Sequence, residues 1–176
     1  MAATLPSSAW AIGDPPPGSE DGYFQPNIQG ALANGLDVGV YFYSQAISVE
    51  EAREEAAFVL ERLEPYQITY PVVFDWEIVG GDEARTYTVG RRTLADCAAA
   101  FCQDIQDAGY DTMIYFTQYL GYRKYMLRTL TEHGFWYAEY EPQPRFAYDF
   151  DMWQYTCYGQ VDGIEGEVDL NIQFLR

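Results

Sequence analysis

The stretch Pro71-Val72-Val73-Phe74-Asp75-Trp76-Glu77 is a short apolar run that ends in two acidic residues. A run of this kind predicts a buried strand. Successive side chains on a strand point to opposite faces, so Asp75 and Glu77 share one face and Trp76 lies on the other. Carboxylates are costly to bury without a purpose. When two carboxyl groups are crowded together, the proton affinity of one rises and the other stays ionised. A pair of this kind is suited to cleaving a glycosidic bond.

Strand and helix patterns alternate along most of the chain. Apolar, β-forming runs predict strands over residues 38–43, 71–77, 112–117, 135–140, 151–156 and 167–172, and helical patterns cover 22–34, 92–108 and 118–132. A further helix opens at the capping box Ser48-Val49-Glu50-Glu51. Alternation of this kind implies parallel strands joined by right-handed crossovers. We therefore expect an α/β barrel of the TIM kind with six strands and without its last helices.

The first twenty residues differ from the rest of the chain. They are rich in Pro, Ser and Gly, and Asp14-Pro15-Pro16-Pro17-Gly18 is a clear breaker. We expect an irregular arm over residues 1–20 and one barrel domain over 21–176, because 176 residues suit a single domain with a sizeable core. A glycine-rich loop is expected near Gly80-Gly81.

Composition narrows the classes of function. The net charge of −17 argues against nucleic acid and against anionic membrane surfaces. No apolar stretch is long enough to span a bilayer, and we expect no signal peptide in this chain. Sixteen tyrosines favour a carbohydrate ligand, although most of them are expected to fill the core. One histidine, and three cysteines without a C-x-x-C pair, predict no metal site, no disulfide framework and no cofactor.

Six segments form a pattern whose order and spacing together are fairly specific. They are Gly39-Val40-Tyr41-Phe42-Tyr43, Pro71-Val72-Val73-Phe74-Asp75-Trp76-Glu77, Ile114-Tyr115-Phe116-Thr117, Phe135-Trp136-Tyr137-Ala138, Met152-Trp153-Gln154-Tyr155-Thr156 and Val168-Asp169-Leu170-Asn171. Together they resemble the lysozymes of glycoside hydrolase family 25, from about Asp21 to the C-terminus. The resemblance implies an irregular (β/α)5(β)3 barrel. It also implies a muramidase, which cleaves the β-1,4 bond between N-acetylmuramic acid and N-acetylglucosamine in bacterial peptidoglycan, outside the cell after secretion or phage release.

The resemblance also assigns roles to residues of this chain. It implies Glu77 as general acid, with Asp75 as its partner. It also implies Asp169 as a further acidic group. Asp169 either orients sugar or water, or is a hydrogen-bonding core residue. Four more residues are expected to bind substrate: Tyr41, Tyr115, Trp136 and Gln154. For Gln154, a structural role at the barrel rim is equally open.

The stereochemical course stays open at this point. Residues two apart on a strand have Cα atoms roughly 6.6 Å apart. The two carboxyl groups can then approach the separation of about 5–5.5 Å that accompanies retention, or exceed the roughly 6.5 Å that accompanies inversion. A third route uses the N-acetyl group of the substrate as nucleophile, and retention by this route is our hypothesis.

The chain departs from the family at its start. Family members open with a strand that carries an active-site aspartate, and here the pattern begins only near Asp21, with Asp14 among prolines before it. We therefore expect a barrel that is incomplete at its N-terminus, with open strand edges covered by residues 1–20 or by a homo-oligomer. The departure leaves an alternative function, a catalytically impaired glycan-binding protein of the same fold. A weaker option is a barrel glycosidase acting on a chitin-like polymer.

Overall fold

The structure is a computed structural model that describes residues 2–6, 9–11, 22–78 and 84–175. The described elements are β1 (Ala2–Pro6), β2 (Ala9–Ala11), α1 (Phe24–Ala33), β3 (Gly39–Ser44), α2 (Val49–Leu63), β4 (Val72–Trp76), α3 (Arg91–Asp107), β5 (Thr112–Thr117), α4 (Gln118–Arg123), a 3-10 helix (Leu127–Thr129), β6 (Gly134–Ala138), β7 (Met152–Gly159) and β8 (Val168–Phe174). All six predicted strands are therefore present, as β3 to β8. The glycine-rich loop expected near Gly80-Gly81 lies outside the described residues.

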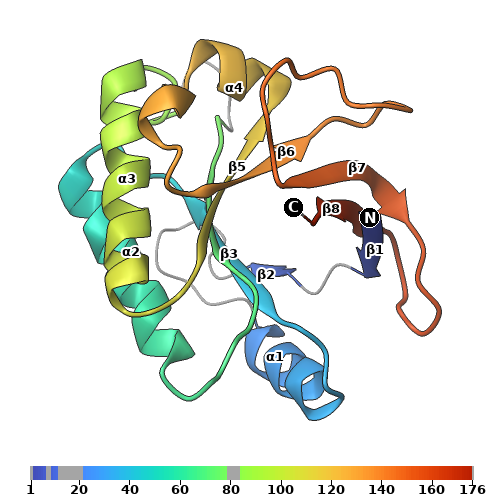
Figure 1. Cartoon of the computed structure of the whole chain (residues 1–176). Coiled ribbons are helices and arrows are strands. Elements are labelled where there is room, and N and C mark those ends of the chain that lie inside the picture. The colour runs from blue at the N-terminus through green and yellow to red at the C-terminus, as the bar shows by residue number, and fades with distance from the viewer. Residues whose placement is uncertain (1, 7–8, 12–21, 79–83, 176) are drawn as a thin grey trace.

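Strands β3 to β8 form a curled half-barrel, with α2 and α3 along its outer side (Figure 1). Strands β3 to β7 pair in sequence order and are parallel, whereas β8 runs antiparallel to β7. Parallel neighbours require crossover connections, which the helices between β3 and β6 provide. The expected fold class, an incomplete α/β barrel of the TIM kind, is confirmed.

Two short strands at the start of the chain flank this half-barrel. Strand β1 pairs antiparallel with β8, and β2 pairs parallel with β3, which extends the sheet to eight strands. The prediction of an irregular arm over residues 1–20 is wrong for these two segments. Their pairing satisfies the N–H and C=O groups at the edges of β3 and β8, a long-range effect that local composition does not reveal. Partial cover of the open edges by residues 1–20 is thus confirmed, and the homo-oligomer stays a prediction.

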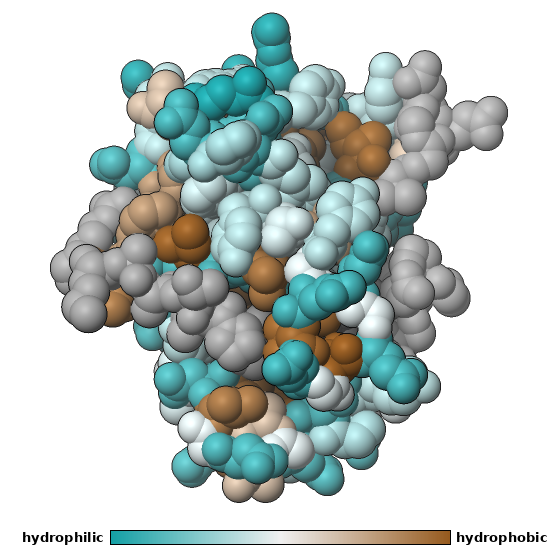
Figure 2. Space-filling view, turned by 90° about the vertical axis from the view of Figure 1, so that its right-hand side faces the viewer, coloured by the Kyte–Doolittle hydropathy of each residue, from teal (hydrophilic) through white to brown (hydrophobic). Residues whose placement is uncertain are grey.

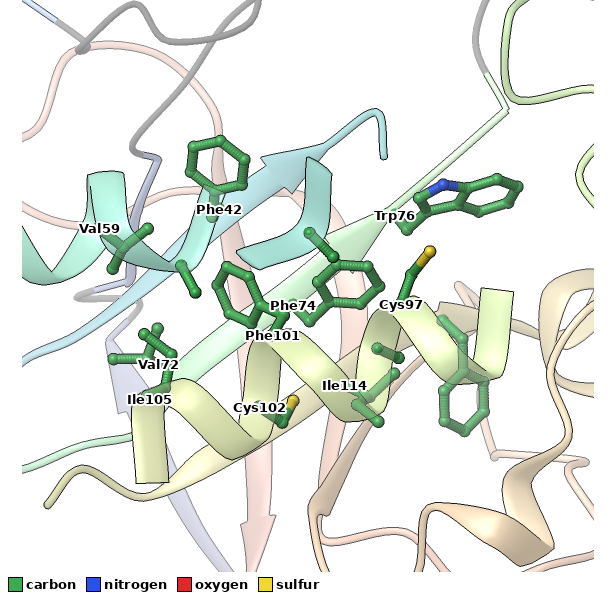
Figure 3. Packing of buried hydrophobic residues seen from close by; sticks show 14 of the residues in the cluster. Phe42, Val59, Val72, Phe74, Trp76, Cys97, Phe101, Cys102, Ile105 and Ile114 are labelled. Atoms are coloured by element: carbon green, nitrogen blue, oxygen red, sulfur yellow. The ribbon is translucent and has the colours of Figure 1, made fainter. Parts of the chain in front are cut away.

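The larger part of the core lies between the sheet and the helices α2 and α3 (Figure 3). Phe74 and Trp76 project from β4 toward these helices, and both are fully buried. The Phe74 ring centroid lies 5.2 Å from that of Phe101 on α3. Cys97 and Cys102, also on α3, are buried free thiols.

The opposite face of β4 lines the inside of the half-barrel. A second, smaller cluster packs there: Val73, Met113, Tyr115, Trp136, Ala138 and Met152. Asp75 follows Val73 by two residues along the strand, so it faces the same interior. Alternation along β4 therefore separates Asp75 from Trp76 as the sequence predicts.

The helix expected over residues 118–132 is much shorter in the structure. α4 ends at Arg123, and only the 3-10 helix Leu127–Thr129 follows before β6. Between them Tyr125 is 1% exposed and packs into the core, and its carbonyl oxygen accepts a hydrogen bond from Arg91 Nη2 at 2.9 Å. Tertiary packing therefore overrides the helical periodicity of this segment.

The surface shown in Figure 2 is mainly hydrophilic, and its hydrophobic residues form small separate groups. This agrees with the excess of acidic residues in the sequence. Of the helices that the structure describes, none combines the length and apolar character needed to cross a bilayer.

Candidate active site

A row of acidic and aromatic residues crosses the inside of the half-barrel near the end of β4. Asp75 is opposite Tyr43 of β3 on one side and Tyr115 of β5 on the other. Tyr115 is in turn opposite Trp136 of β6. Residues at paired positions of neighbouring strands project to the same face of a sheet. The register of four strands therefore gathers these side chains at one place.

A pocket of about 310 Å³ lies at this place. Its described lining comprises Tyr41, Tyr43, Asp75, Glu77, Tyr115, Trp136, Tyr140, Gln154 and Asp169. All seven residues predicted for the site are thus brought together in one pocket, and their roles in a reaction stay predictions. Sequence reasoning did not select Tyr43, and it named Glu139 and Tyr140 only as strand-end residues that could reach substrate; of these two, Tyr140 lines the pocket. The position of Tyr43 two residues after Tyr41 signals a shared face, whereas Tyr140 follows the end of β6, where strand periodicity no longer applies.

Asp75 is the most deeply buried acidic group among the described lining residues. It is 9% exposed, and its Oδ1 atom has no hydrogen-bond partner among the residues that the structure describes. Burial raises the pKa of Asp75 well above its ordinary value, and the carboxyl groups of Glu77 and Asp169 raise it further. The group therefore favours its protonated form, and a positive charge placed beside it would shift it toward the carboxylate.

Glu77 and Asp169 are partly buried carboxyl groups of the same pocket. Burial raises the pKa of each of them. The main chain of Glu77 is held in place, because its carbonyl oxygen accepts hydrogen bonds from Thr86 Oγ1 at 3.2 Å and from Gln45 Nε2 at 3.5 Å. A carboxyl group whose pKa is raised, carried on a main chain that is held in place, has the properties of a general acid.

Gln154 is held by two tyrosines. Its Oε1 atom accepts hydrogen bonds from the hydroxyl groups of Tyr115 at 2.9 Å and of Tyr140 at 2.8 Å. Burial raises the pKa of Tyr115 far above its usual range and that of Tyr140 to about 12, so both hydroxyls stay protonated and act as donors. This fixes the amide plane of Gln154, whose Nε2 group lies in the wall of the pocket and can donate to a ligand.

The aromatic rings of the pocket pack edge to face. The Trp136 ring centroid lies 5.1 Å from that of Tyr115 and 6.4 Å from that of Tyr41. The Trp136 indole donates a hydrogen bond to Asn171 Oδ1 at 2.8 Å, which fixes its orientation. Tyr115 and Trp136 are only 8% and 5% exposed, so they can present a ring edge to a ligand and not a full stacking face.

Comparison with known families agrees with this geometry. Residues 18–164 match the family described as Glycosyl hydrolases family 25. The chain belongs to this family. The resemblance inferred from the six sequence segments is thereby confirmed.

Individual relatives of this glycosyl hydrolase family 25 chain add detail. The uncharacterized protein YegX of Escherichia coli K12 is 28% identical over 156 residues, which cover 86% of this chain and 53% of YegX. The chain therefore spans about half the length of the curated relatives that it matches.

Solved structures show the same fold. The modular autolysin LytC of Streptococcus pneumoniae, in complex with a synthetic peptidoglycan ligand, superposes with a TM-score of 0.75 at 23% identity, over 95% of this chain and 41% of LytC. The bacterial lysozyme of Streptomyces coelicolor superposes with a TM-score of 0.70 at 20% identity, over 93% of this chain and 77% of the lysozyme.

The described pocket offers oxygen and nitrogen groups of neutral or acidic character. Its polar side chains are three carboxyl groups, one amide and several phenols. No group of three or more His, Cys, Asp or Glu side chains in the described part of the chain is arranged to hold a metal ion. Hydrogen-bond donors and acceptors beside aromatic edges suit a ligand rich in hydroxyl and amide groups.

Proposed function

We propose that this chain is a peptidoglycan hydrolase that cleaves the β-1,4 bond between N-acetylmuramic acid and N-acetylglucosamine. The observation that carries the proposal is the convergence of Asp75, Glu77 and Asp169 in one pocket with aromatic walls. Most glycosidases place two carboxyl groups with different roles at the scissile bond. Membership of glycosyl hydrolase family 25 supports the reaction class, and the LytC complex with a peptidoglycan ligand supports the substrate class.

Glu77 is the general acid in this proposal. Its raised pKa keeps a proton available, and the proton passes to the glycosidic oxygen as the bond from that oxygen to C1 breaks. The N-acetyl carbonyl oxygen of N-acetylmuramic acid, the sugar that carries C1, attacks C1 from the other face. This attack gives a cyclic cation. Water then attacks C1 and loses a proton to Glu77 while the bond from C1 to the acetamido oxygen breaks, so the configuration at C1 is retained overall.

Asp75 stabilises the cationic intermediate. The free pocket holds Asp75 in its protonated form, because the group is buried beside two other carboxyl groups. A cation at the acetamido group lowers the pKa of Asp75, which releases its proton to water and becomes a carboxylate, so its attraction is strongest when positive charge develops. The Nε2 group of Gln154, oriented by Tyr115 and Tyr140, donates a hydrogen bond to the sugar. Asp169 orients sugar or water.

The proposed site of action lies outside the cell that makes the protein, after secretion or after release by a phage. Bacterial peptidoglycan is the proposed partner, since the autolysin LytC, which shares this fold, has been solved in complex with a synthetic peptidoglycan ligand. The catalytically impaired glycan-binding protein remains the second candidate, because the six segments that carry the family resemblance do not include the first-strand aspartate expected for the family.

Clearing of a bacterial cell-wall suspension tests the proposal. The wild-type protein should lower the turbidity, and borohydride reduction of the released fragments should yield muramitol, since the proposed cleavage leaves muramic acid at the reducing end. Glu77→Gln should lose about two to four orders of magnitude in rate, the usual contribution of a general acid. Glu165→Gln is the matched control, because Glu165 lies in an exposed loop and should leave clearing unchanged.

The products separate the alternatives. Equal clearing by wild type and Glu77→Gln contradicts the assignment of the acid, and an inverted product rules out the N-acetyl route. Saturable binding to peptidoglycan without new reducing ends identifies the glycan-binding alternative. Glucosaminitol in place of muramitol shows that a different bond is cleaved.

A further inference from the structure

The turn Ser44–Ala46 connects β3 to α2. It is hydrogen-bonded to Trp76 and Glu77 at the end of β4. The Trp76 indole donates a hydrogen bond to the carbonyl oxygen of Ala46 at 3.0 Å. The Gln45 amide reaches the carbonyl oxygen of Glu77 at 3.5 Å, where Thr86 Oγ1 also donates at 3.2 Å. The position of Glu77 relative to the pocket therefore depends on the position of this turn.

The conformation of the turn Ser44–Ala46 depends on one carboxyl group of α2, that of Glu55. Glu55 accepts a hydrogen bond from Ser44 Oγ at 2.6 Å through Oε2 and from the Gln45 backbone N–H at 3.1 Å through Oε1. Ser44 Oγ itself accepts from the Ala46 backbone N–H at 3.2 Å. Ser44 is fully buried, so water cannot replace these bonds without rearrangement of the turn.

We propose that Glu55 is a positioning residue for Glu77, acting through the turn Ser44–Ala46 and the side chain of Gln45. Glu55 does not line the pocket, and its effect on a reaction is indirect. The kinetic part of this inference rests on the proposed function, whereas its structural part does not. A carboxylate with two acceptor oxygens suits this place, because it satisfies a hydroxyl and a backbone N–H together.

The geometry also makes the turn sensitive to protonation. Burial raises the pKa of Glu55 to about 7, against hydrogen bonds from Ser44 and Gln45 that lower it. Glu51 on the same helix raises the pKa of Glu55 further and Arg85 lowers it, and these two groups are paired with each other at 2.7 Å. The Cys97 thiol of α3 also interacts with Glu55, which raises the pKa of that thiol.

Protonation changes the hydrogen bonds that Glu55 can make. The ionised carboxylate accepts from both Ser44 and Gln45. The protonated carboxyl group carries a hydrogen on one oxygen, so Ser44 must accept from Glu55 and can no longer donate to it. The variant Glu55→Gln has the shape and the donor pattern of the protonated form, and it cannot titrate. It therefore fixes the turn in one of its two states.

The indole N–H resonance of Trp76 reports on the turn directly, because this group donates to Ala46. In a ¹H–¹⁵N NMR titration of the full chain, wild type should show a chemical-shift change of Trp76 with a midpoint at about pH 7, the value to which burial raises the pKa of Glu55. Glu55→Gln should show no transition there. Glu54→Gln is the matched control, since Glu54 is exposed on the same helix and should leave the transition in place. A wild-type transition that persists in Glu55→Gln overturns the proposal.

Kinetics then test the consequence for Glu77. Glu55→Ala removes both acceptors and should lower kcat of cell-wall cleavage about ten- to a hundredfold, the loss that follows from a displacement of about 1 Å, while KM changes less than about threefold. Glu55→Gln should retain activity but flatten the pH profile near neutrality. If wild type does not cleave cell walls, the proposed function fails and the NMR titration still decides the role of Glu55. If wild type cleaves and Glu55→Ala keeps its kcat, the positioning role fails alone.

Discussion

Replacing Asp75 by asparagine should make the protein more stable while it removes activity. Asp75 is 9% exposed and its Oδ1 atom lacks a hydrogen bond to the described residues. A buried polar group without a partner costs about 1–3 kcal/mol, and more when it is charged. Asparagine keeps the shape of the side chain and removes the charge. Since the asparagine oxygen has no more partners than the Asp75 oxygen it replaces, the gain comes from removing the charge, and we expect about 1–3 kcal/mol in the free energy of unfolding at about pH 8, where ionisation of the buried carboxyl group is most favoured.

The pH dependence of this gain follows from linkage. The pKa of Asp75 is raised in the folded protein, so the folded state holds the proton more tightly than the unfolded chain. Stability of the wild type therefore falls as the pH rises from the unfolded pKa toward the folded one. The advantage of Asp75→Asn should accordingly be small at about pH 4.5, where the folded wild type carries a neutral group, and larger at about pH 8.

Thermal unfolding at the two pH values measures the effect. For a domain of this size each kcal/mol shifts Tm by about 2–4 °C, so the expected rise at the higher pH is roughly 2–12 °C. Asp162→Asn is the control, because Asp162 is exposed in the loop between β7 and β8 and its substitution removes the same unit of charge. The reasoning is refuted if Asp75→Asn melts no higher than wild type at about pH 8, or if Asp162→Asn gives an equal gain.

Two further predictions concern stability away from the pocket. Burial alone would raise the pKa of Glu139, but hydrogen bonds from the Arg145 backbone N–H, the Tyr137 hydroxyl and the Arg145 guanidinium outweigh it and lower the pKa. Glu139→Gln should therefore cost about 1.5–3 kcal/mol at neutral pH in urea unfolding, and a cost that does not shrink as the pH falls through the lowered pKa contradicts this assignment. A Cβ atom at Gly39 would lie 2.7 Å from the carbonyl oxygen of Pro71, so Gly39→Ala should cost about 1–3 kcal/mol. Gly30→Ala on α1, where nothing lies within 4 Å, should cost nothing, and equal losses in the two variants would refute the steric explanation.

Local patterns predicted those parts of the molecule whose structure is decided locally. Alternation placed Asp75 and Glu77 on one face, and the capping box placed the start of α2, where Ser48 Oγ accepts from the Glu51 backbone N–H at 3.2 Å. The strands β1 and β2 escaped prediction because they exist through pairing with β8 and β3, which are distant in sequence. The early end of α4 has a similar cause in the burial of Tyr125.

The candidate site shows the same division between local and long-range effects. The seven predicted residues lie at strand positions or strand ends, where the side-chain direction follows from the period of two. Glu55 escaped notice because it stands on a helix among Glu50, Glu51 and Glu54, where an acidic residue is ordinarily a solvated one. Only the approach of the turn Ser44–Ala46 to this helix distinguishes it.

The two faces of β4 explain how the fold tolerates its acidic pocket. Asp75 and Glu77 flank Trp76, so the strand cannot place the carboxyl groups inside the half-barrel without placing the indole in the helical core. A register shift of one residue would reverse both placements at once, exposing Phe74 and Trp76 and driving carboxyl groups among the apolar side chains of α3. Such a shift is costly, because full burial of one large apolar side chain contributes about 1.5–3 kcal/mol, and the shift would lose this contribution for Phe74 and Trp76. The packing of Phe74 and Trp76 against α2 and α3 therefore offsets the cost of burying Asp75 and fixes the direction in which Glu77 points.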